Sequence, residues 1–485
     1  MSEGDRRGEA AGDGPGDASG APEKAVQLGI WELAWPSVLS NRLFSITGVI
    51  GIKVVAVLGA PAAAAASVGN QVFFSMQAVL MAVSVGTTAL VARAWGAKDE
   101  EEAARTTLTS LFVGGAVAIL IMIPGMALAY PIAGLFGLRE ETTQLAGDFI
   151  YWLSVFNVAF SVNFIMSAAL RAAGDARTPL WIGVATNVVA VAGFYVLIFG
   201  EFGLPALGVK GAAIANGLAF TLAGLLFLGL WVSGRLLLPY HGFELRSILD
   251  GARVRRLLQV GYPAALEQGV FRIGFFVFLW VIGNFYGTEA FAAYGIGVNI
   301  LSLCFVVGFG FSIAGSTLVG QNLGAGDVEA ATASGWRSLR WAMGSMIVLG
   351  LIIIAAARPI AAFMIDDAVV IAHTVAFIYI LGAVQPLMAV EFAIGGALRG
   401  AGDTRYPLKA TMAGLIGMRC TLAVIFSLLA LPVEWVYGAL VGDYAMKALM
   451  LTQRFRSGRW RTMLSSEGAS EGSTDGPTDG ETARA

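Results

Sequence analysis

The chain has 485 residues, of which 57% are hydrophobic and only 13% are charged, and its formal net charge is −2 at pH 7. Soluble domains usually carry about 25% charged residues, so this composition excludes an ordinary soluble protein. The sequence shows no nucleophile triad, metal-ligand cluster, Walker loop or dinucleotide fingerprint. We therefore expect neither an enzyme nor an ATP-driven pump, and no cofactor.

Apolar runs of transmembrane length follow one another along most of the chain. A helix of about 20 apolar residues crosses the hydrocarbon core of a bilayer, which is about 30 Å thick. The runs predict an all-α polytopic membrane protein with twelve transmembrane helices in two parallel six-helix repeats. The predicted spans cover 28–52, 62–92, 106–130, 144–170, 179–200, 211–234, 257–285, 289–320, 334–356, 369–398, 407–430 and 434–453.

The segments outside the spans are more polar. Residues 1–27 and 456–485 are expected to be disordered tails, because their ends are rich in Gly, Ser, Asp and Glu and poor in large apolar residues. Between the tails we expect a first lobe over 28–236, a linker over 237–256 and a second lobe over 257–455. The first residues lack the apolar core of a signal peptide, so no cleavage is expected.

The two halves share motifs at one constant offset along the chain. ALRAAGDARTPL at 169–180 matches ALRGAGDTRYPL at 397–408 in nine of twelve positions, and LVARAWGAKD at 90–99 returns as LVGQNLGAGD at 318–327. We call this shared separation, which relates Leu90 to Leu318, the repeat offset. Six spans per half is an even number, so both halves enter the membrane in the same sense. An axis along the membrane normal should relate them, with a substrate route between the halves.

The distribution of Lys and Arg predicts the orientation. With the N-terminus inside, 24 of the 31 basic residues fall on the inner side, and the outer side keeps only Lys53, Arg139, Lys210 and Arg358. Inner loops of membrane proteins carry this excess of positive charge. Both termini and the linker are therefore expected in the cytoplasm, with the protein in the plasma membrane.

The LR-x-x-GD motif ends the fourth and tenth spans. Gly174 and Gly402 can adopt the left-handed conformation that stops a helix. Thr178 before Pro179 is expected to cap the next helix, since proline is favoured at the first helical position. These features predict a structural role for the motif, and a gating contact between the two motif loops is the alternative.

These motifs resemble the multidrug and toxic compound extrusion (MATE) family of prokaryotes. The resemblance rests on ALRGAGDTRYP, TLVGQNLGAGD, TTALVARAWGAKD and GVKGAAIA at 208–215, and it covers about residues 28–455. It implies a twelve-helix antiporter that exports cationic or amphipathic compounds in exchange for H⁺ or Na⁺. We expect a monomer in contact with membrane lipid, with a small-molecule substrate and no nucleic-acid partner. The alternative is a flippase for a lipid-linked or polyanionic precursor, which a basic central cavity would favour.

The resemblance also shows where this chain departs from the family. Many bacterial and archaeal members have one aspartate in span one and another in span five. Here Ile50 and Gly51 stand in the first region, and Ala190, Gly193 and Phe194 in the second. An ion site in the first half is therefore not expected.

Glu267 on span seven and Glu391 on span ten are the candidate ion-coupling acids. An ionised side chain inside a membrane span costs about 2.5–3.5 kcal/mol on insertion scales, so it usually faces a cavity and has a partner. A carboxyl group in a poorly hydrated cavity can bind and release H⁺, and with neighbouring oxygens it can hold Na⁺ instead. The family resemblance favours this location, because some members bind cations with acids of spans seven and ten. No other metal site is expected.

Structural ion pairing is the alternative role for these acids. The intramembrane arginines that could serve as partners are Arg42, Arg272 and Arg419. Glu391 with Arg419, or Glu267 with Arg42, would then hold helices together. Glu267 and Arg272 are about 140° apart around one helix, so each needs a partner on another span.

Further polar side chains lie within the spans. Asp443 and Lys447 are four residues apart on span twelve and can pair with each other. The candidates for lining a substrate cavity are Asn70, Gln71, Gln268, Asn299 and Gln385. Among these, Gln71 and Asn299 are related by the repeat offset, which indicates symmetric lining. Hydrogen bonding between helices is the alternative.

Overall fold

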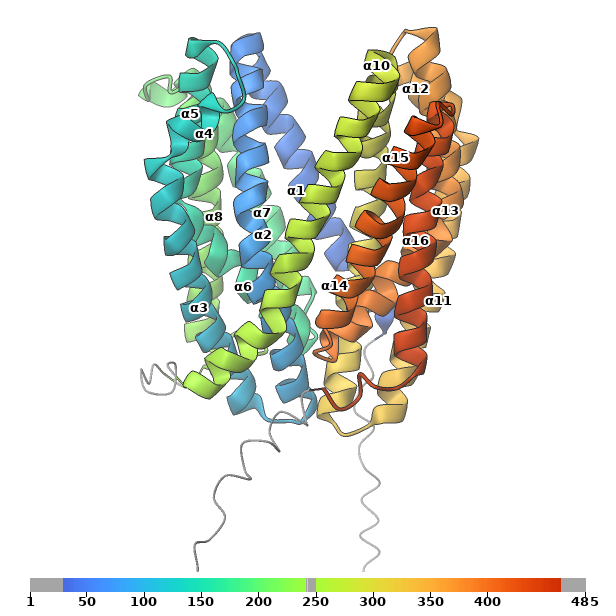
Figure 1. Ribbon diagram of the computed structural model, residues 1–485. Coiled ribbons are helices and arrows are strands. Elements are labelled where there is room, and N and C mark those ends of the chain that lie inside the picture. Colours follow the sequence, from blue (N-terminus) through green and yellow to red (C-terminus); the bar gives the residue numbers. More distant parts are fainter. Residues whose placement is uncertain (1–28, 241, 243–249, 464–485) are drawn as a thin grey trace, which may run out of the picture.

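The computed structural model describes residues 29–240, 242 and 250–463, so most of the predicted tails and part of the predicted linker lie outside the described residues. The described chain folds into helices connected by short turns (Figure 1). The helices of the first half are α1 Ile30–Ala56, α2 Ala60–Gly96, α3 Glu100–Ala127, α4 Ala129–Gly134, α5 Glu140–Val155, α6 Asn157–Ala173, α7 Arg177–Phe199, the 3-10 turn η1 Glu201–Gly203 and α8 Val209–Val232. Those of the second half are α10 Gly251–Gly324, α11 Val328–Ala355, α12 Ala357–Met364, α13 Ala368–Gly400, α14 Arg405–Thr411, the π-helix η2 Met412–Cys420, α15 Thr421–Leu428 and α16 Val433–Arg456.

The membrane spans agree with the sequence prediction. Nine described helices are long and apolar enough to cross a membrane, and the bent pair of α5 and α6 makes a tenth span. α10 supplies two spans, because its 74 residues break at Gly287, which has a φ of 80°. α16 corresponds to the twelfth predicted span. Asp443 and Lys447 make this helix less apolar, but both side chains are buried. The all-α membrane fold is confirmed, and the spans of the described residues are consistent with the predicted twelve.

The LR-x-x-GD turns are formed by glycine and aspartate. Gly174 and Gly402 adopt φ values of 106° and 88°, as predicted. The prediction that Thr178 caps α7 is wrong, because the helix already begins at Arg177. Instead, Asp175 Oδ1 accepts the backbone N–H groups of Arg177 at 3.1 Å and Thr178 at 2.9 Å. The aspartate before the first turn thus satisfies two N–H groups that have no partner within the helix.

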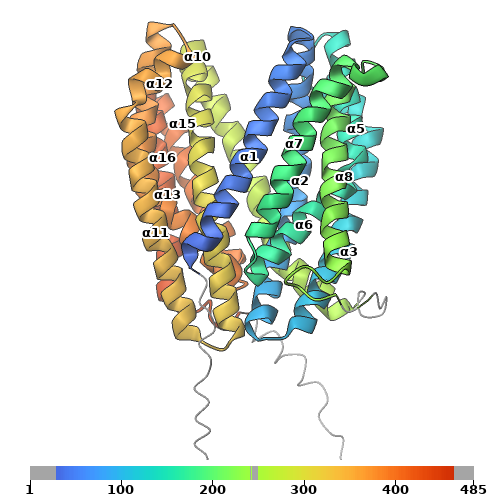
Figure 2. The ribbon, with the colours of Figure 1, turned by 180° about the vertical axis from the view of Figure 1, so that it is seen from behind.

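The helices form two lobes that meet most closely at one end of the molecule. Figures 1 and 2 show α2 to α8 on one side and α11 to α16 on the other, with the two lobes splaying apart from a common base. We call the base, where the end of α2 meets the end of α10, the closed end of the molecule, and the opposite end the open end. The lobes therefore diverge towards the open end.

The first helix of each half crosses to the other lobe at the closed end. Ile30, Leu33 and Ala34 at the start of α1 belong to the same buried cluster as Phe311 of α10. Leu257 near the start of α10 packs in turn with buried residues of the first lobe. The two crossings are the structural counterpart of the sequence repeat, and they tie the lobes together.

Repeat-related glycines allow close packing at the closed end. A Cβ atom added to Gly96 would overlap the carbonyl oxygen of Gln321, and one added to Gly324 would overlap that of Arg93. The repeat offset relates Gly96 to Gly324 and Arg93 to Gln321, so the contact is reciprocal. Glycine lets two helix backbones approach in this way because it has no side chain.

The LR-x-x-GD motif of the first half joins this contact. Thr317 Oγ1 donates to the carbonyl oxygen of Arg171 at 3.2 Å, and Gln321 Nε2 donates to that of Ala172 at 2.8 Å. Both donors belong to the second lobe and both acceptors to the first. The motif therefore takes part in holding the lobes together, in addition to ending a helix.

Candidate functional site

Six charged side chains meet inside the second lobe. We call them the charge cluster, and its members are Glu267, Glu391, Arg399, Arg419, Asp443 and Lys447. They come from α10, α13, η2 and α16, which the packing of the lobe brings together (Figure 1). Three acids and three bases give the cluster a formal charge of zero, which makes its burial tolerable.

Four members form a chain of ion pairs. Lys447 Nζ lies 3.1 Å from Glu391 Oε1 and 3.2 Å from Asp443 Oδ1. Arg419 Nη2 lies 2.7 Å from Asp443 Oδ2. Lys447 thus connects Glu391 of α13 to Asp443 on its own helix, and Asp443 continues the chain to η2. The predicted pair of Asp443 and Lys447 is confirmed.

The Arg419–Asp443 pair is the most deeply buried part of the cluster. Arg419 is 2% exposed and Asp443 is inaccessible. Their contact is an ion pair without an aligned hydrogen bond. The guanidinium also lies over the rings of Phe278 and Tyr444, 5.7 Å and 5.4 Å from the ring centres, and such contacts stabilise a desolvated cation.

Local backbone features bring α16 and η2 close enough for this pairing. A Cβ atom added to Gly414 of η2 would overlap the carboxylate of Asp443. The π-helical stretch Met412–Cys420 also differs from a regular α-helix, and single π-turns inside helices are frequent at functional sites. The lack of a side chain at Gly414 and the π-helical winding of η2 therefore allow η2 to approach Asp443 closely.

Glu267 forms the second part of the cluster. Its Oε1 accepts from Arg399 Nη2 at 2.6 Å and from Thr411 Oγ1 at 3.0 Å. Glu267 is 8% exposed, so this carboxylate has little contact with solvent. One acid on α10 is thereby connected to the LR-x-x-GD motif at the end of α13 and to the start of span eleven.

The pairings proposed as the structural alternative are wrong in detail. Glu391 pairs with Lys447 instead of Arg419, and Glu267 pairs with Arg399 instead of Arg42. Lys447 on α16 lies within reach of both Glu391 and Asp443, while Arg399 at the end of α13 reaches Glu267. The expectation that Glu267 finds its partner on another span is confirmed.

Arg42 and Arg272 lie outside the charge cluster. Arg272 Nη2 donates to the carbonyl oxygen of Phe74 on α2 at 2.9 Å, so this arginine connects the two lobes without an acid. Arg42 lies on α1 and is half-buried. Among the residues that the structure describes, neither arginine forms an ion pair.

The candidate cavity residues differ in burial. Gln71 and Asn299 are exposed, whereas Asn70 and Gln268 are half-buried. Asn299 Nδ2 donates to the carbonyl oxygen of Gly295 at 3.0 Å on its own helix. Gln385 is fully buried and donates to the carbonyl oxygen of Leu381 at 3.2 Å. Their role in lining a substrate cavity stays a prediction.

Sequence reasoning missed the role of Arg399. It treated this residue only as part of a repeated motif, like Arg171. The overlooked signal is the asymmetry of the repeat, because the residue that the repeat offset relates to Glu267 is Leu39. The motif arginine of the second half therefore has an acid available at a position where the first half has a leucine.

The region of Gly51 and Phe194 in the first lobe is apolar. Phe194 is fully buried, and a Cβ atom added to Gly51 would lie 3.0 Å from the end of its ring. Ala190 is 3% exposed. Tight aromatic packing thus occupies the positions where the resemblance implied acids in other members.

Replacing Asp443 with asparagine is expected to destabilise the second lobe strongly. The change leaves Arg419 buried without a charged partner, and breaking a buried pair costs about 3–5 kcal/mol. Thermal unfolding of the purified protein in detergent measures the effect. Glu101→Gln is the control, because Glu101 pairs with Arg105 on the exposed surface of α3 and surface pairs contribute about 0–1 kcal/mol. Equal unfolding temperatures for the two variants would contradict the assignment.

Comparison with known proteins agrees with the fold and the repeat. A family model described as MatE matches residues 36–196 and 263–425, which is one match in each half. A probable multidrug resistance protein NorM of Thermotoga maritima is 29% identical over 90% of this chain and 94% of its own length. The multidrug resistance protein NorM of Burkholderia vietnamiensis is 28% identical over 78% of this chain and 82% of its own length.

Solved structures show the same architecture. A transporter of the MOP superfamily from Pyrococcus furiosus, described as having a binding pocket of reversed polarity, superposes with a TM-score of 0.82 at 21% identity. It covers 89% of this chain and 95% of its own. An outward-facing MATE transporter gives a TM-score of 0.80 at 20% identity, covering 88% and 95%. With its repeated helices and the match in both halves, the chain is a multi-pass membrane protein that belongs to the MATE family of efflux transporters.

Proposed function

We propose that this protein exports cationic or amphipathic organic compounds from the cell in exchange for H⁺, by alternating access between its two lobes. The relatives named as multidrug resistance proteins support the substrate class. The observation that carries the ion coupling is the charge cluster, a neutral set of buried acids and bases shared by four helical segments of one lobe.

The ion pairs favour H⁺ over Na⁺ as the coupling ion. A sodium ion at Glu391 or Glu267 would have to displace Lys447 or Arg399 from hydrogen-bonding distance. A proton can instead neutralise the carboxylate where it stands. Neutral Glu391 would no longer attract Lys447, and the contact between α13 and α16 would weaken. Protonation of Glu391 would thus shift the equilibrium towards the conformation in which this contact is weaker.

We place the closed end in the cytoplasm and the open end outside the cell, with the protein in the plasma membrane. The closed end carries Arg171 of the first LR-x-x-GD motif and, at the start of α10, Arg253, Arg255 and Arg256, in agreement with the positive-inside rule. In this orientation both chain termini lie in the cytoplasm, and the described conformation is open to the outside.

Transport by the purified protein in proteoliposomes tests the proposal. A cationic dye should move out of the compartment that faces the closed end when a pH gradient is imposed, and protons should move in the opposite direction. A sodium gradient at constant pH should have little effect. Dye movement without a matching proton flux would contradict proton antiport, and sodium-driven movement would replace H⁺ by Na⁺.

Export or flipping of an anionic precursor is the second candidate function. It is favoured by Arg42 and Arg272, which lie on the first helices of the two halves and form no ion pair among the residues described. The same proteoliposomes can be loaded with a fluorescent lipid that carries a pyrophosphate group. Movement of this lipid in place of the cationic dye would support the second function over the first.

A further inference from the structure

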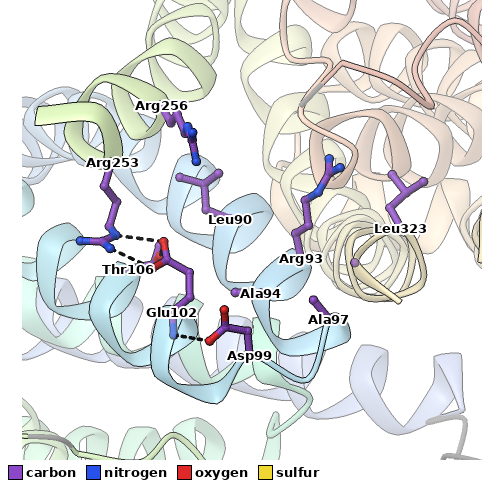
Figure 3. A pocket seen from close by; sticks show the side chains of 11 residues that line it. Leu90, Arg93, Ala94, Ala97, Asp99, Glu102, Thr106, Arg253, Arg256 and Leu323 are labelled. Atoms are coloured by element: carbon purple, nitrogen blue, oxygen red, sulfur yellow. Dashed lines mark hydrogen bonds and ion pairs between the residues drawn. The ribbon is translucent and has the colours of Figure 1, made fainter. Parts of the chain in front are cut away.

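A small pocket lies between the lobes at the closed end. The closed-end pocket is lined by the end of α2, the start of α3 and both ends of α10, and its charged residues are Arg93, Asp99, Glu102, Arg253 and Arg256. Figure 3 shows these side chains around it. Its volume is about 270 Å³, which lies below the range of about 300–1,000 Å³ typical of sites for drug-sized ligands. The pocket therefore suits a smaller molecule or a single chemical group.

The two acids of the pocket already have partners. Glu102 accepts two hydrogen bonds from Arg253, from Nε at 3.0 Å and from Nη2 at 2.8 Å. Asp99 caps α3 and accepts the backbone N–H of Glu102 at 2.9 Å. With Glu102 paired to Arg253, the pocket retains Arg93 and Arg256 against the single carboxylate of Asp99, and hence an excess of one positive charge.

The guanidinium of Arg93 has an unsatisfied hydrogen-bond donor. Its Nη1 is buried without a hydrogen-bond partner among the residues described. The equivalent residue of the second half is the neutral Gln321, whose amide donates to the carbonyl oxygen of Ala172. The repeat thus places a satisfied amide on one side and an unsatisfied guanidinium on the other. Arg93 as a whole is half-buried, but a buried N–H group without an acceptor costs free energy, and an anion in the pocket would supply that acceptor.

Arg256 provides the second contact from a different helix. It lines the same pocket from the start of α10, and it is exposed and has no ion-pair partner in the described part of the chain. Two guanidinium groups from separate helices suit an anion with several acceptor oxygens. Arginine binds phosphate well because its planar fork donates two parallel hydrogen bonds.

We propose that the closed-end pocket binds a phosphate group through Arg93 and Arg256, and that binding stabilises the conformation in which the closed end is shut. Arg93 belongs to the first lobe, whereas Leu323 and Gly324 at the other wall belong to the second. Separation of the lobes at this end would remove one wall of the pocket. A ligand that binds one conformation only shifts the protein towards that conformation.

Phosphate binding at this pocket does not depend on the exported substrate, and its regulatory role rests only on the orientation proposed above. With the closed end in the cytoplasm, the phosphate group can come from a soluble phosphate compound or from the headgroup of an anionic lipid. Occupancy would hold the transporter open to the outside and slow its return to the inward-open state. The pocket would then connect transport rate to a phosphate-containing molecule on the inner side.

Thermal unfolding with inorganic pyrophosphate as the probe tests binding. The wild-type protein in detergent should show a saturable rise in Tm of about 3 °C or more relative to chloride at equal ionic strength. Arg93→Gln and Arg256→Gln should each abolish the rise. Arg177→Gln is the matched control, since Arg177 is also exposed and lies outside the pocket. An equal rise in the control and in both pocket variants, or no rise in the wild type, would overturn the proposal for a soluble phosphate.

A second measurement separates the two phosphate sources and reports the conformation. Spin labels at Glu101 and Glu329, which are exposed and related by the repeat offset, report the distance between the lobes at the closed end. The labelled protein has Cys304 and Cys420 replaced by alanine. Pyrophosphate in neutral-lipid nanodiscs, or phosphatidylglycerol in the nanodisc without pyrophosphate, should increase the short-distance population in a manner that depends on Arg93 and Arg256. The condition that increases this population identifies whether the phosphate group comes from a soluble compound or from a lipid. An unchanged population under both conditions would overturn the proposal.

Discussion

Replacing Glu391 with glutamine is expected to reduce proton-driven export by about tenfold or more, which corresponds to roughly 1.4 kcal/mol or more of lost driving interaction. Glutamine has nearly the same shape but cannot bind or release a proton. Its contact with Lys447 would therefore stay the same through the transport cycle. Dye export driven by a pH gradient in proteoliposomes measures the effect. Downhill dye movement without a gradient should be affected less.

A second variant distinguishes coupling from simple ion pairing. The change of Glu391 alone leaves Lys447 with only Asp443 as an acidic partner, which by itself could lower stability. Replacing both Glu391 and Lys447 with glutamine restores the balance of charge in the cluster. The double variant should recover thermal stability but remain uncoupled. Recovery of proton-driven export in the double variant would show that the pair is only structural.

The matched control lies on α10. Glu289→Gln removes an acid that is exposed near the break of the same helix that carries Glu267. Its export should equal that of the wild type. If this control loses as much proton-driven export as the Glu391 variant, the assignment of coupling to the charge cluster is wrong.

Alanine at Gly96 or Gly324 is expected to prevent closure of the closed end. The added methyl group would overlap a backbone carbonyl oxygen of the opposite lobe, which cannot rotate away as a side chain can. Overpacking of this kind costs about 1–3 kcal/mol. Such an energy shifts a two-state equilibrium about 5- to 150-fold, so the outward-open state should become rare and export should fall by a similar factor.

The distance between spin labels at Glu101 and Glu329 measures this shift directly. The long-distance population should increase in the Gly96→Ala and Gly324→Ala variants, while helical content and expression are retained. Gly344→Ala is the control, because no atom lies within 4 Å of the added Cβ. An unchanged distance distribution in both glycine variants would show that the glycine contact does not control closure.

The charge cluster and the closed end divide the two tasks of a transporter between different parts of the fold. The cluster lies within one lobe, where a change in protonation can alter the packing of α13 against α16. The reciprocal glycine contact lies between the lobes, where small differences in packing determine which side is shut. The crossing starts of α1 and α10 connect these regions, because each first helix contacts both lobes.

Much of the fold was predictable because its signals are local in the sequence. A run of about 20 apolar residues is sufficient to predict a span, and the repeat offset aligns the two halves. The left-handed turns at Gly174 and Gly402 also followed from residue type alone. The pairing of Asp443 with Lys447 was predictable for the same reason, since four residues separate neighbours on one helix face.

The sequence by itself thus determined the spans, the repeat, the helix-ending glycines and the lack of acids in the first half at Leu39 and Asn163, the positions related to Glu267 and Glu391. Only the tertiary structure decided that Arg399 pairs with Glu267, that Lys447 joins Glu391 to Asp443, and that Gly96 and Gly324 form a reciprocal contact. Hydropathy and spacing report the length of a helix and its faces. The rotation, crossing and neighbours of each helix depend on packing between segments far apart in the chain, and most of the contacts that form the charge cluster and the closed end are of this kind.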